Sequence, residues 1–471
     1  MADSTFITLT APGPREVVNE QRANEIIQTW TDQLHSSSSS STDNHLLQCH
    51  KIVFSNKSYT SQAATLLASF LTNPRHDDLT TQPMTYQRPL ASTVKIVNLS
   101  DIIASRKEAE GLDVLRTMCD IFKDSDLEEV NLSDNAMGSK GVTACHSVLQ
   151  GQVTSLERLL LCNNGLSEAS MNEVADILCG TSEMDTEGEE EEKRMGSRLT
   201  QLHFYNNMSG NGGCQAFARI LSTCSETLED IRFSGTRAGR EGSLWISKAL
   251  EQLGGKIIHL KYLDLADNTF GTEGGSILAK ALRRCVSLQR LNLRDCVLED
   301  EATSVICRAL WAADAPMEIL DLSGNEITKQ GAKAIAELLQ DTQSTLKIFH
   351  CEENEMTSKG VVSIASALGG VLEELRLGFN ECGSMGANAL VTANGEDGDG
   401  MPSLQKIFLD GNMFPEKDVA QLTESFGDKL EEMEDNDDEG DADDELSESE
   451  DDEEDEVDEL SKAMGKTNIT N

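Results

Sequence analysis

The residues that could perform acid–base or nucleophilic chemistry do not follow any familiar catalytic spacing. The eight histidines are spread from His35 to His350 without the spacing of metal ligands. His203 and His350 lie in apolar segments, where packing or surface roles are more common than catalysis. The patterns GxxxxGK[ST], GxSxG and HExxH are absent, so the sequence predicts no nucleotide-phosphate loop, hydrolase elbow or zinc-protease site.

The remaining reactive groups do not assemble a site either. The 12 cysteines occur singly, without a CxxC pair, which argues against a zinc site. Carboxylates are concentrated in segments 183–192 and 431–459, where nothing rigid would hold a general acid–base pair. These residues predict a protein-binding scaffold without metal or cofactor, and they argue against an independent metabolic enzyme.

The elements that would position any binding residues come from an internal repeat. The pattern LxxLxLxxN recurs, for example as Leu156-x-x-Leu159-x-Leu161-x-x-Asn164, and each copy precedes a stretch with helical apolar spacing. Twelve units begin at positions 49, 94, 127, 156, 199, 228, 260, 288, 317, 346, 372 and 404. Because one unit cannot bury its own apolar face, neighbouring units must stack.

The spacing selects the fold class. Apart from two long intervals, the units lie about 29 residues apart, a length that accommodates a full helix after each strand. We therefore expect an α/β leucine-rich repeat solenoid, a ribonuclease-inhibitor-like horseshoe with parallel strands inside and helices outside. The repeat asparagine should turn the chain and bond backbone groups at the bend. Asn164 fills that slot in its unit, so the preceding Asn163 is surplus and should project from the rim.

The expected domain organisation has three parts. Residues 1–45 form a strand–helix cap around Arg15–Leu34 and a flexible link at Ser36–Ser41, and residues 46–427 form the repeat domain. The long intervals hold a surface loop near 72–89 and an acidic insert at 183–194. Residues 428–471 are expected to be a disordered acidic tail, because they contain few apolar groups.

The charge of the chain limits its partners. The formal net charge is −43, and segment 431–459 contributes 21 acidic residues and no Lys or Arg. Such a surface disfavours nucleic-acid binding and favours a basic protein partner. The N-terminus does not resemble a signal peptide, and no apolar run is long enough to cross a membrane. We expect a protein of the cytosol or nucleus with reduced thiols.

The ordered set of repeat segments, together with the acidic tail, resembles the Ran GTPase-activating proteins, and most closely the plant and protist forms. The resemblance covers about residues 45–459. It is carried by Lys51-Ile-Val-Phe-Ser-Asn-Lys-Ser-Tyr59, Val130-Asn-Leu-Ser-Asp-Asn-Ala-Met-Gly138, Leu161-Cys-Asn-Asn-Gly-Leu166, Phe204-Tyr-Asn-Asn-Met208 and Leu263-Asp-Leu-Ala-Asp-Asn-Thr-Phe-Gly271. The chain lacks the WPP-type domain of plant members and the sumoylated domain of animal members. We therefore expect a cytoplasmic, at most perinuclear, protein.

The resemblance implies an activator that acts in trans on Ran in its GTP form, as a monomer, together with a Ran-binding protein. In that family an asparagine orders the glutamine of the GTPase and no arginine finger is supplied. The matching asparagine is Asn163, and the matching loop arginine is Arg106, for which a contact or structural role is favoured over a finger. Lys107 is a candidate partner contact. Other rim candidates are Asp134, Asn135, Asn207, Asp267 and Asp295, although Asn135 and Asn207 fill turn slots and favour a structural role.

Two alternatives remain open from the sequence. An acidic leucine-rich histone-binding protein would also join a solenoid to an acidic tail, but its repeats are shorter and fewer. An inhibitor or immune-sensor solenoid has the same repeat length without needing Asn163, the Arg106 loop or the tail.

Overall fold

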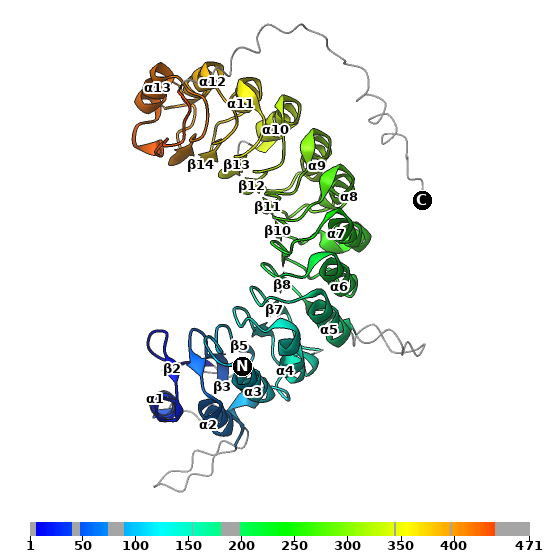
Figure 1. The fold of residues 1–471 in the computed structure, drawn as a ribbon, viewed down its shortest axis with the longest axis vertical. Helices are drawn as coiled ribbons and strands as arrows, with labels where there is room; N and C mark the ends of the chain where they lie inside the picture. The colour runs from blue at the N-terminus through cyan, green and yellow to red at the C-terminus, as the bar shows by residue number, and fades with distance from the viewer. Residues whose placement is uncertain are drawn as a thin grey trace.

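The chain folds into one curved solenoid of stacked strand–helix units (Figure 1). The structure is a computed structural model that describes residues 6–39, 48–73, 89–152, 154–179, 198–342, 345–395 and 398–438. Thirteen parallel strands form a continuous sheet along the concave side, in the order β1-β3-β5 and then β6 through β15 in sequence. The helices form the convex layer, so the predicted horseshoe with strands inside is confirmed.

The elements follow one another regularly along the chain. The strands are β1 (Phe6–Thr10), β2 (Val17–Val18), β3 (Gln48–Val53), β4 (Ser58–Tyr59), β5 (Ile96–Asn98), β6 (Glu129–Asn131), β7 (Arg158–Leu160), β8 (Gln201–His203), β9 (Asp230–Arg232), β10 (Tyr262–Asp264), β11 (Arg290–Asn292), β12 (Ile319–Asp321), β13 (Ile348–His350), β14 (Glu374–Arg376) and β15 (Lys406–Phe408). The helices are α1 (Glu20–Ser39), α2 (Ser61–Thr72), α3 (Glu108–Asp120), α4 (Gly138–Gln150), α5 (Glu168–Cys179), α6 (Gly210–Ser222), α7 (Arg240–Leu253), α8 (Gly271–Leu282), α9 (Glu299–Ala313), α10 (Lys329–Thr342), α11 (Thr357–Ala365), α12 (Ser384–Asn394) and α13 (Glu416–Phe426), with short 3-10 turns at Leu90–Thr93, Gly254–Ile257 and Gly427–Lys429.

The core lies between the sheet and the helical layer. In the short strands the middle residue points inward, as Leu159 does in β7, and it pairs in register with Leu202 of β8. The buried faces of the helices supply the other half of the core, as Ile335 and Leu339 do in α10. Each buried leucine or isoleucine contributes about 1.5–3 kcal/mol. All twelve predicted units supply a strand to this sheet, and β1 adds a thirteenth in front of them.

The asparagine of each complete repeat occupies a buried slot at the bend after the strand. Asn325 is fully buried, and its Nδ2 donates to the carbonyls of Leu293, Leu322 and Ser323 at 2.8–3.0 Å. Its Oδ1 accepts from the backbone N–H of Cys296 at 3.0 Å in the preceding repeat. The side chain therefore bonds polar backbone groups on two repeats, and without it the Leu293 carbonyl and the Cys296 N–H would be buried without this partner.

Lys57 occupies the same slot in the first unit and performs a different task. Its side chain is 1% exposed, and Nζ donates to the carbonyls of Gly13, at 2.7 Å, and Pro14. Glu16 lies 3.5 Å away and balances its charge. The buried ammonium thus binds the loop between β1 and β2 to the first repeat.

Two expectations about segment ends need correction. Ser36–Ser39, predicted as part of a flexible link, continue helix α1. The predicted disordered tail does not begin at 428, because Leu430 bridges to Ile407 beside β15. Asn436 also exchanges hydrogen bonds with the backbone of Phe414, with its Oδ1 accepting at 3.1 Å and its Nδ2 donating at 2.9 Å. These contacts give the last repeat a partner for its open edge, which a composition argument does not detect.

Other expectations fall largely or wholly outside the described residues: the loop at 74–88, the acidic insert 183–194 and the tail beyond 438. Within the described part of the chain, no helix is long and apolar enough to cross a membrane.

Candidate functional site

One residue in each repeat stands directly before the buried slot, and these twelve residues form a row along the rim at the carboxyl ends of the strands. All twelve have left-handed backbone conformations, with φ between 51° and 69°. The backbone N–H of each residue from the first to the eleventh bonds the next repeat, as Asn163 does to the Tyr205 carbonyl at 3.0 Å. The rim positions are Asn56, Asp101, Asp134, Asn163, Asn206, Gly235, Asp267, Asp295, Gly324, Glu353, Phe379 and Gly411.

The conformation explains the residue types at these positions. A left-handed backbone disfavours most L-residues, whereas glycine, asparagine and aspartate tolerate it. Asn163 therefore has a backbone reason to be asparagine, independent of any function. Its side chain is nevertheless exposed, while Asn164 occupies the fully buried slot. This orientation agrees with the geometry predicted from the sequence.

Asn163 lies in the middle of a chain of three polar side chains from three successive repeats. Its Nδ2 donates to Asp134 Oδ1 at 2.9 Å, and its Oδ1 accepts from Asn206 Nδ2 at 3.1 Å. All three side chains are exposed. A carboxamide has two N–H donors and an oxygen with two lone pairs. Asn163 therefore keeps one donor and one acceptor for a partner, and its two neighbours fix how it is turned.

Asn135 and Asn207 do not belong to this exposed set. They are 2% and 1% exposed, and their amides bond backbone groups across two repeats, as Asn207 Nδ2 does to the Leu161 carbonyl at 3.0 Å. The structural role that their turn slots favoured is the one observed, and their side chains cannot reach a partner. The exposed neighbour of Asn207 is Asn206, which the sequence reasoning overlooked.

Arg106 and Lys107 follow the rim position of the second repeat. Ser105 has φ 62°, the conformation for which glycine is favoured, and it turns the chain toward α3. The Arg106 side chain is 16% exposed, with its guanidinium 3.7 Å from Glu110. Its Nε is buried and has no hydrogen-bond partner among the described residues. Lys107 is exposed. The arginine is thus held against its own helix, and the lysine faces outward.

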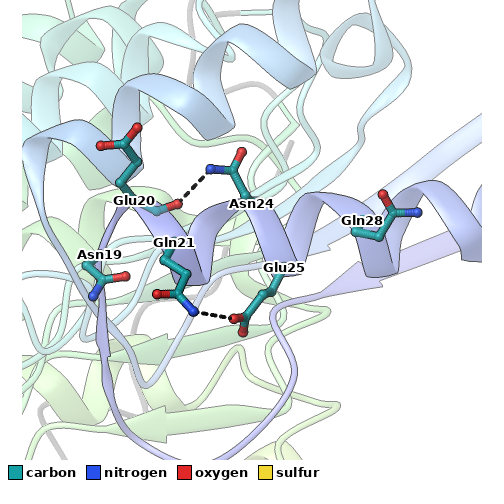
Figure 2. Close-up of a pocket in the computed structure, with 6 residues that line it drawn as sticks. All are labelled: Asn19, Glu20, Gln21, Asn24, Glu25 and Gln28. Carbon is teal, nitrogen blue, oxygen red and sulfur yellow. Dashed lines mark hydrogen bonds between the residues drawn. The ribbon is translucent and has the colours of Figure 1, made fainter.

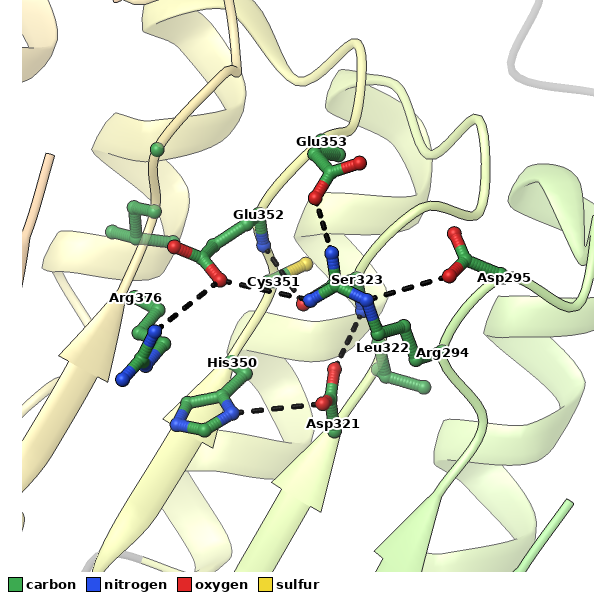
Figure 3. A network of polar contacts seen from close by, with 12 residues as sticks. Arg294, Asp295, Asp321, Leu322, Ser323, His350, Cys351, Glu352, Glu353 and Arg376 are labelled. Atoms are coloured by element: carbon green, nitrogen blue, oxygen red, sulfur yellow. Dashed lines mark hydrogen bonds and ion pairs between the residues drawn. The ribbon is translucent and has the colours of Figure 1, made fainter. Parts of the chain in front are cut away.

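Asp267 and Asp295 are exposed rim positions further along the row. Arg294 reaches from the concave face toward this edge, where Figure 3 shows it among Asp295, Glu352 and Glu353, with its Nε 3.4 Å from Asp295 Oδ2. Burial raises the pKa of Asp295, and the nearby carboxylates of Glu353 and Asp267 raise it further against the opposing effect of Arg294. This half of the rim therefore accumulates negative charge that Arg294, together with Arg376 at 3.9 Å from Glu352, only partly balances.

Sequence reasoning missed several exposed residues around Asn163. Tyr205 and Met208 are 38% and 59% exposed on either side of Asn206 and its slot neighbour. Arg15, from the N-terminal loop, pairs with the rim residue Asp101 at 2.8 Å and keeps 61% of its side chain exposed. Large apolar residues beside a repeat slot were the available signal for Tyr205 and Met208. No repeat pattern points to Arg15.

The remaining polar groups support the fold. On the concave sheet, His203 lies 2.9 Å from Asp230, and His350 lies 3.0 Å from Glu374. His350 also lies 3.5 Å from Asp321 (Figure 3). All 12 cysteines are free, and only Cys179 is more than slightly exposed. Among the residues described, no cluster of three or more His, Cys, Asp or Glu side chains could hold a metal ion.

A surface hollow lies on helix α1. It is lined only by polar residues, and two of the contacts that fix them are Gln21 to Glu25 at 3.2 Å and Asn24 to the Glu20 carbonyl at 3.0 Å (Figure 2). These side chains bond to their own helix and bring no nucleophile or acid–base pair together.

Comparison with known proteins agrees with the repeat. The family described as Leucine Rich repeat matches residues 123–144, 256–279, 284–307 and 315–336. Among solved structures, the yeast Rad7 and Elc1 complex covers 88% of this chain and 90% of its own, with 14% identity and a TM-score of 0.45. The chain is a leucine-rich repeat protein.

Two curated relatives share more specific sequence. Ran GTPase-activating protein 1 of Saccharomyces cerevisiae is 29% identical over 241 residues, 50% of this chain and 56% of the relative. RAN GTPase-activating protein 1 of Arabidopsis thaliana is 34% identical over 149 residues, 32% of this chain and 22% of the relative. The chain thus spans about half of the first relative and less of the second. It is a leucine-rich repeat protein that resembles Ran GTPase-activating proteins.

Proposed function

We propose that this leucine-rich repeat protein is a GTPase-activating protein for Ran, acting in trans and without a nucleotide site of its own. The observation that carries the proposal is the exposed Asn163 carboxamide, held by Asp134 and Asn206 on the rim. Similarity to two Ran GTPase-activating proteins supports the choice of partner. Activation of the related Ras system reaches about 10⁵-fold, roughly 7 kcal/mol of barrier.

The proposed mechanism uses the free donor and acceptor of Asn163. A glutamine of the GTPase has the complementary pair in its own carboxamide, so two hydrogen bonds would fix its orientation beside the attacking water. Because Asn163 is already oriented by its neighbours, little side-chain freedom is lost when the complex forms. The activator thereby supplies positioning, and the catalytic amide belongs to the GTPase.

Arg106 is assigned a supporting role in this proposal. Its guanidinium is largely buried near Glu110, so reaching a γ-phosphate would require leaving that environment. Lys107, which is exposed beside it, is the better candidate for direct contact. Asp134, Asp267 and Asp295 are candidates for pairing with basic residues of Ran, and the strong negative charge of the chain would speed encounter. We place the activity in the cytoplasm, with a monomeric activator and a Ran-binding protein as an additional partner.

The test is single-turnover GTP hydrolysis by purified Ran, with and without a substoichiometric amount of this protein. We expect an increase of several orders of magnitude. Heat-denatured protein is the control for added salts, and the folded protein with GTP but without Ran is the control for contaminating hydrolases. If the folded protein leaves the rate unchanged, the proposed function is wrong.

The second candidate is a scaffold for basic proteins such as histones, which the net charge of −43 favours. That function would need neither Asn163 nor a GTPase. Binding of histones at physiological salt, combined with no effect on Ran, would support this candidate in place of the first.

A further inference from the structure

Phe379 is the exception in the row of rim positions. The other eleven are asparagine, aspartate, glutamate or glycine, whereas Phe379 places a large apolar ring at the rim with 47% of its surface exposed. It stands at the eleventh repeat, after β14 and seven strands beyond the position of Asn163. An exposed aromatic residue is common at protein interfaces, where it anchors binding.

The fold gains little from a phenylalanine at this place. The backbone has φ 54°, a left-handed conformation that is unfavourable for a bulky side chain. Asparagine or glycine would satisfy the same bend at lower conformational cost, as they do at Asn163, Asn206 and Gly324. The aromatic ring is therefore better explained by contact with a binding partner than by a contribution to the fold.

The Phe379 ring packs against the next repeat. It lies against the backbone of Gly411 at the next rim position, so closely that a Cβ on Gly411 would overlap it. The Phe379 N–H donates to the Asp410 carbonyl at 2.9 Å, which fixes the residue from below. One face is thus covered by the last repeat, and the remaining surface is presented to solvent in a fixed position.

Two carboxylates neighbour this aromatic residue, one in the row of rim positions and one in the sequence, and they indicate what it contacts. Glu353, at the preceding rim position, pairs with Arg294 yet is 51% exposed, and Glu381 is exposed two residues after Phe379. Cations bind the faces of aromatic rings, arginine most often, and a nearby carboxylate attracts the same cation. The same repeats contain such a pair on the concave face, where the Arg376 guanidinium lies 3.7 Å from the centre of the Phe408 ring.

We propose that Phe379, Glu353 and Glu381 form a second docking point, the distal rim patch, which binds an arginine or lysine on a basic surface of the same GTPase that engages Asn163. This inference rests on the proposed function. Seven strand spacings correspond to about 34 Å along the arc. A globular partner of about 200 residues is roughly 40 Å across, so it can contact both points at once.

The test is a titration of the protein against Ran loaded with GTP, measuring the saturated single-turnover rate and the half-saturating concentration. Phe379→Asn removes the ring and keeps a residue that tolerates the left-handed backbone. We expect the half-saturating concentration to rise roughly tenfold with an unchanged saturated rate. The thermal midpoint should stay the same or increase, whereas a purely structural ring would lower it.

Two further variants make the test specific. Phe379→Tyr retains an aromatic face and should bind as the wild type does. Trp311→Ala removes another large exposed ring, 60% exposed on the convex helix α9, and should leave the titration unchanged. If the wild type activates Ran and Phe379→Asn gives the same titration as the wild type, the distal rim patch does not bind Ran and the proposed function stands. If the wild type does not activate Ran, both proposals are wrong.

Discussion

Asn163 Nδ2 donates to Asp134 Oδ1 across the boundary between two repeats, at 2.9 Å. The two side chains come from equivalent rim positions 29 residues apart, and both backbones are left-handed. The repeat geometry alone places them side by side, because each strand lies beside its neighbour in register. The stacking of the repeats in register thus orients the exposed carboxamide of Asn163.

Replacing Asn163 by glycine should abolish most of the proposed activation. Glycine tolerates φ 51° and so removes the amide without straining the backbone. We expect the saturated single-turnover rate to fall by about 100- to 1,000-fold, the range seen when one positioned amide is lost from a transition state. Stopped-flow measurement of phosphate release at saturating activator provides the readout.

Asn163→Ala is the matched comparison, because it also removes the amide but adds left-handed strain of about 1–2 kcal/mol. Equal losses in the two variants would assign the effect to the amide. An active glycine variant beside an inactive alanine variant would show instead that only the bend matters.

Asp134→Gly should have a smaller effect of the same kind. It removes the acceptor that orients Asn163 and retains a residue suited to φ 62°. Loss of one exposed hydrogen bond, worth about 1 kcal/mol, should lower the saturated rate about five-fold. Asp134→Asn retains an acceptor oxygen and should restore most of the rate. If Asp134→Gly changes only the half-saturating concentration, Asp134 is a contact and not a positioning residue.

Asn325→Ala should destabilise the solenoid without involving the candidate site. The substitution leaves the buried carbonyl of Leu293 and the buried N–H groups of Cys296 and Leu298 without their partner. Unpaired buried groups of this kind cost about 2–4 kcal/mol in total. Urea unfolding followed by circular dichroism should show a clearly lower midpoint. Glu326→Asn, at the exposed neighbouring residue, should shift it by no more than about 0.5 kcal/mol.

Asp264 on the concave sheet predicts a stability that depends on pH. Burial raises its pKa above 3.8, and the hydrogen bonds from Ala266 N–H and Ser234 oppose this only partly. The folded protein therefore binds this proton more readily than the unfolded chain, so the ionised carboxylate reduces stability as pH rises through its folded pKa.

Asp264→Asn removes that charge and retains an acceptor oxygen. The variant should be more stable than the wild type at neutral pH, by less than about 1 kcal/mol after solvent screening. The advantage should shrink as pH falls from neutral and disappear well below 3.8, where the wild-type carboxyl is neutral in both states. Urea midpoints at several pH values would measure this difference, and a constant difference would contradict the assignment.

The sequence predicted the fold well because the same strand–helix pattern occurs in twelve units. The pattern around Leu159, Leu161 and Asn164 specifies a strand, a buried face and a bend together, so errors at one repeat are corrected by the others. Helix ends and segment boundaries have no such redundancy. Ser36–Ser39 extend α1 and Leu430 pairs with Ile407 for tertiary reasons that local composition does not contain.

The candidate site was only partly predictable for a related reason. The repeat identified the slot residues, and the surplus asparagine before Asn164 correctly indicated an exposed side chain. The same rule, applied to Asn206 and Asn207, would have selected the first of the pair as the exposed residue. The pairing of Arg15 with Asp101 joins residues 86 positions apart, and no periodicity in the sequence encodes it.

The row of rim positions also affects how such a protein can change over time. Each position from the first to the eleventh is anchored to the next repeat through its backbone, tolerates glycine, asparagine or aspartate, and directs any side chain away from the core. New partner preferences can therefore be acquired by single substitutions that leave the scaffold intact. Duplication or loss of one whole repeat would instead move every later rim residue by about 4.8 Å relative to the earlier ones. Evolution or design can thus change the binding surface of the solenoid one rim residue at a time, with the spacing between the rim residues kept.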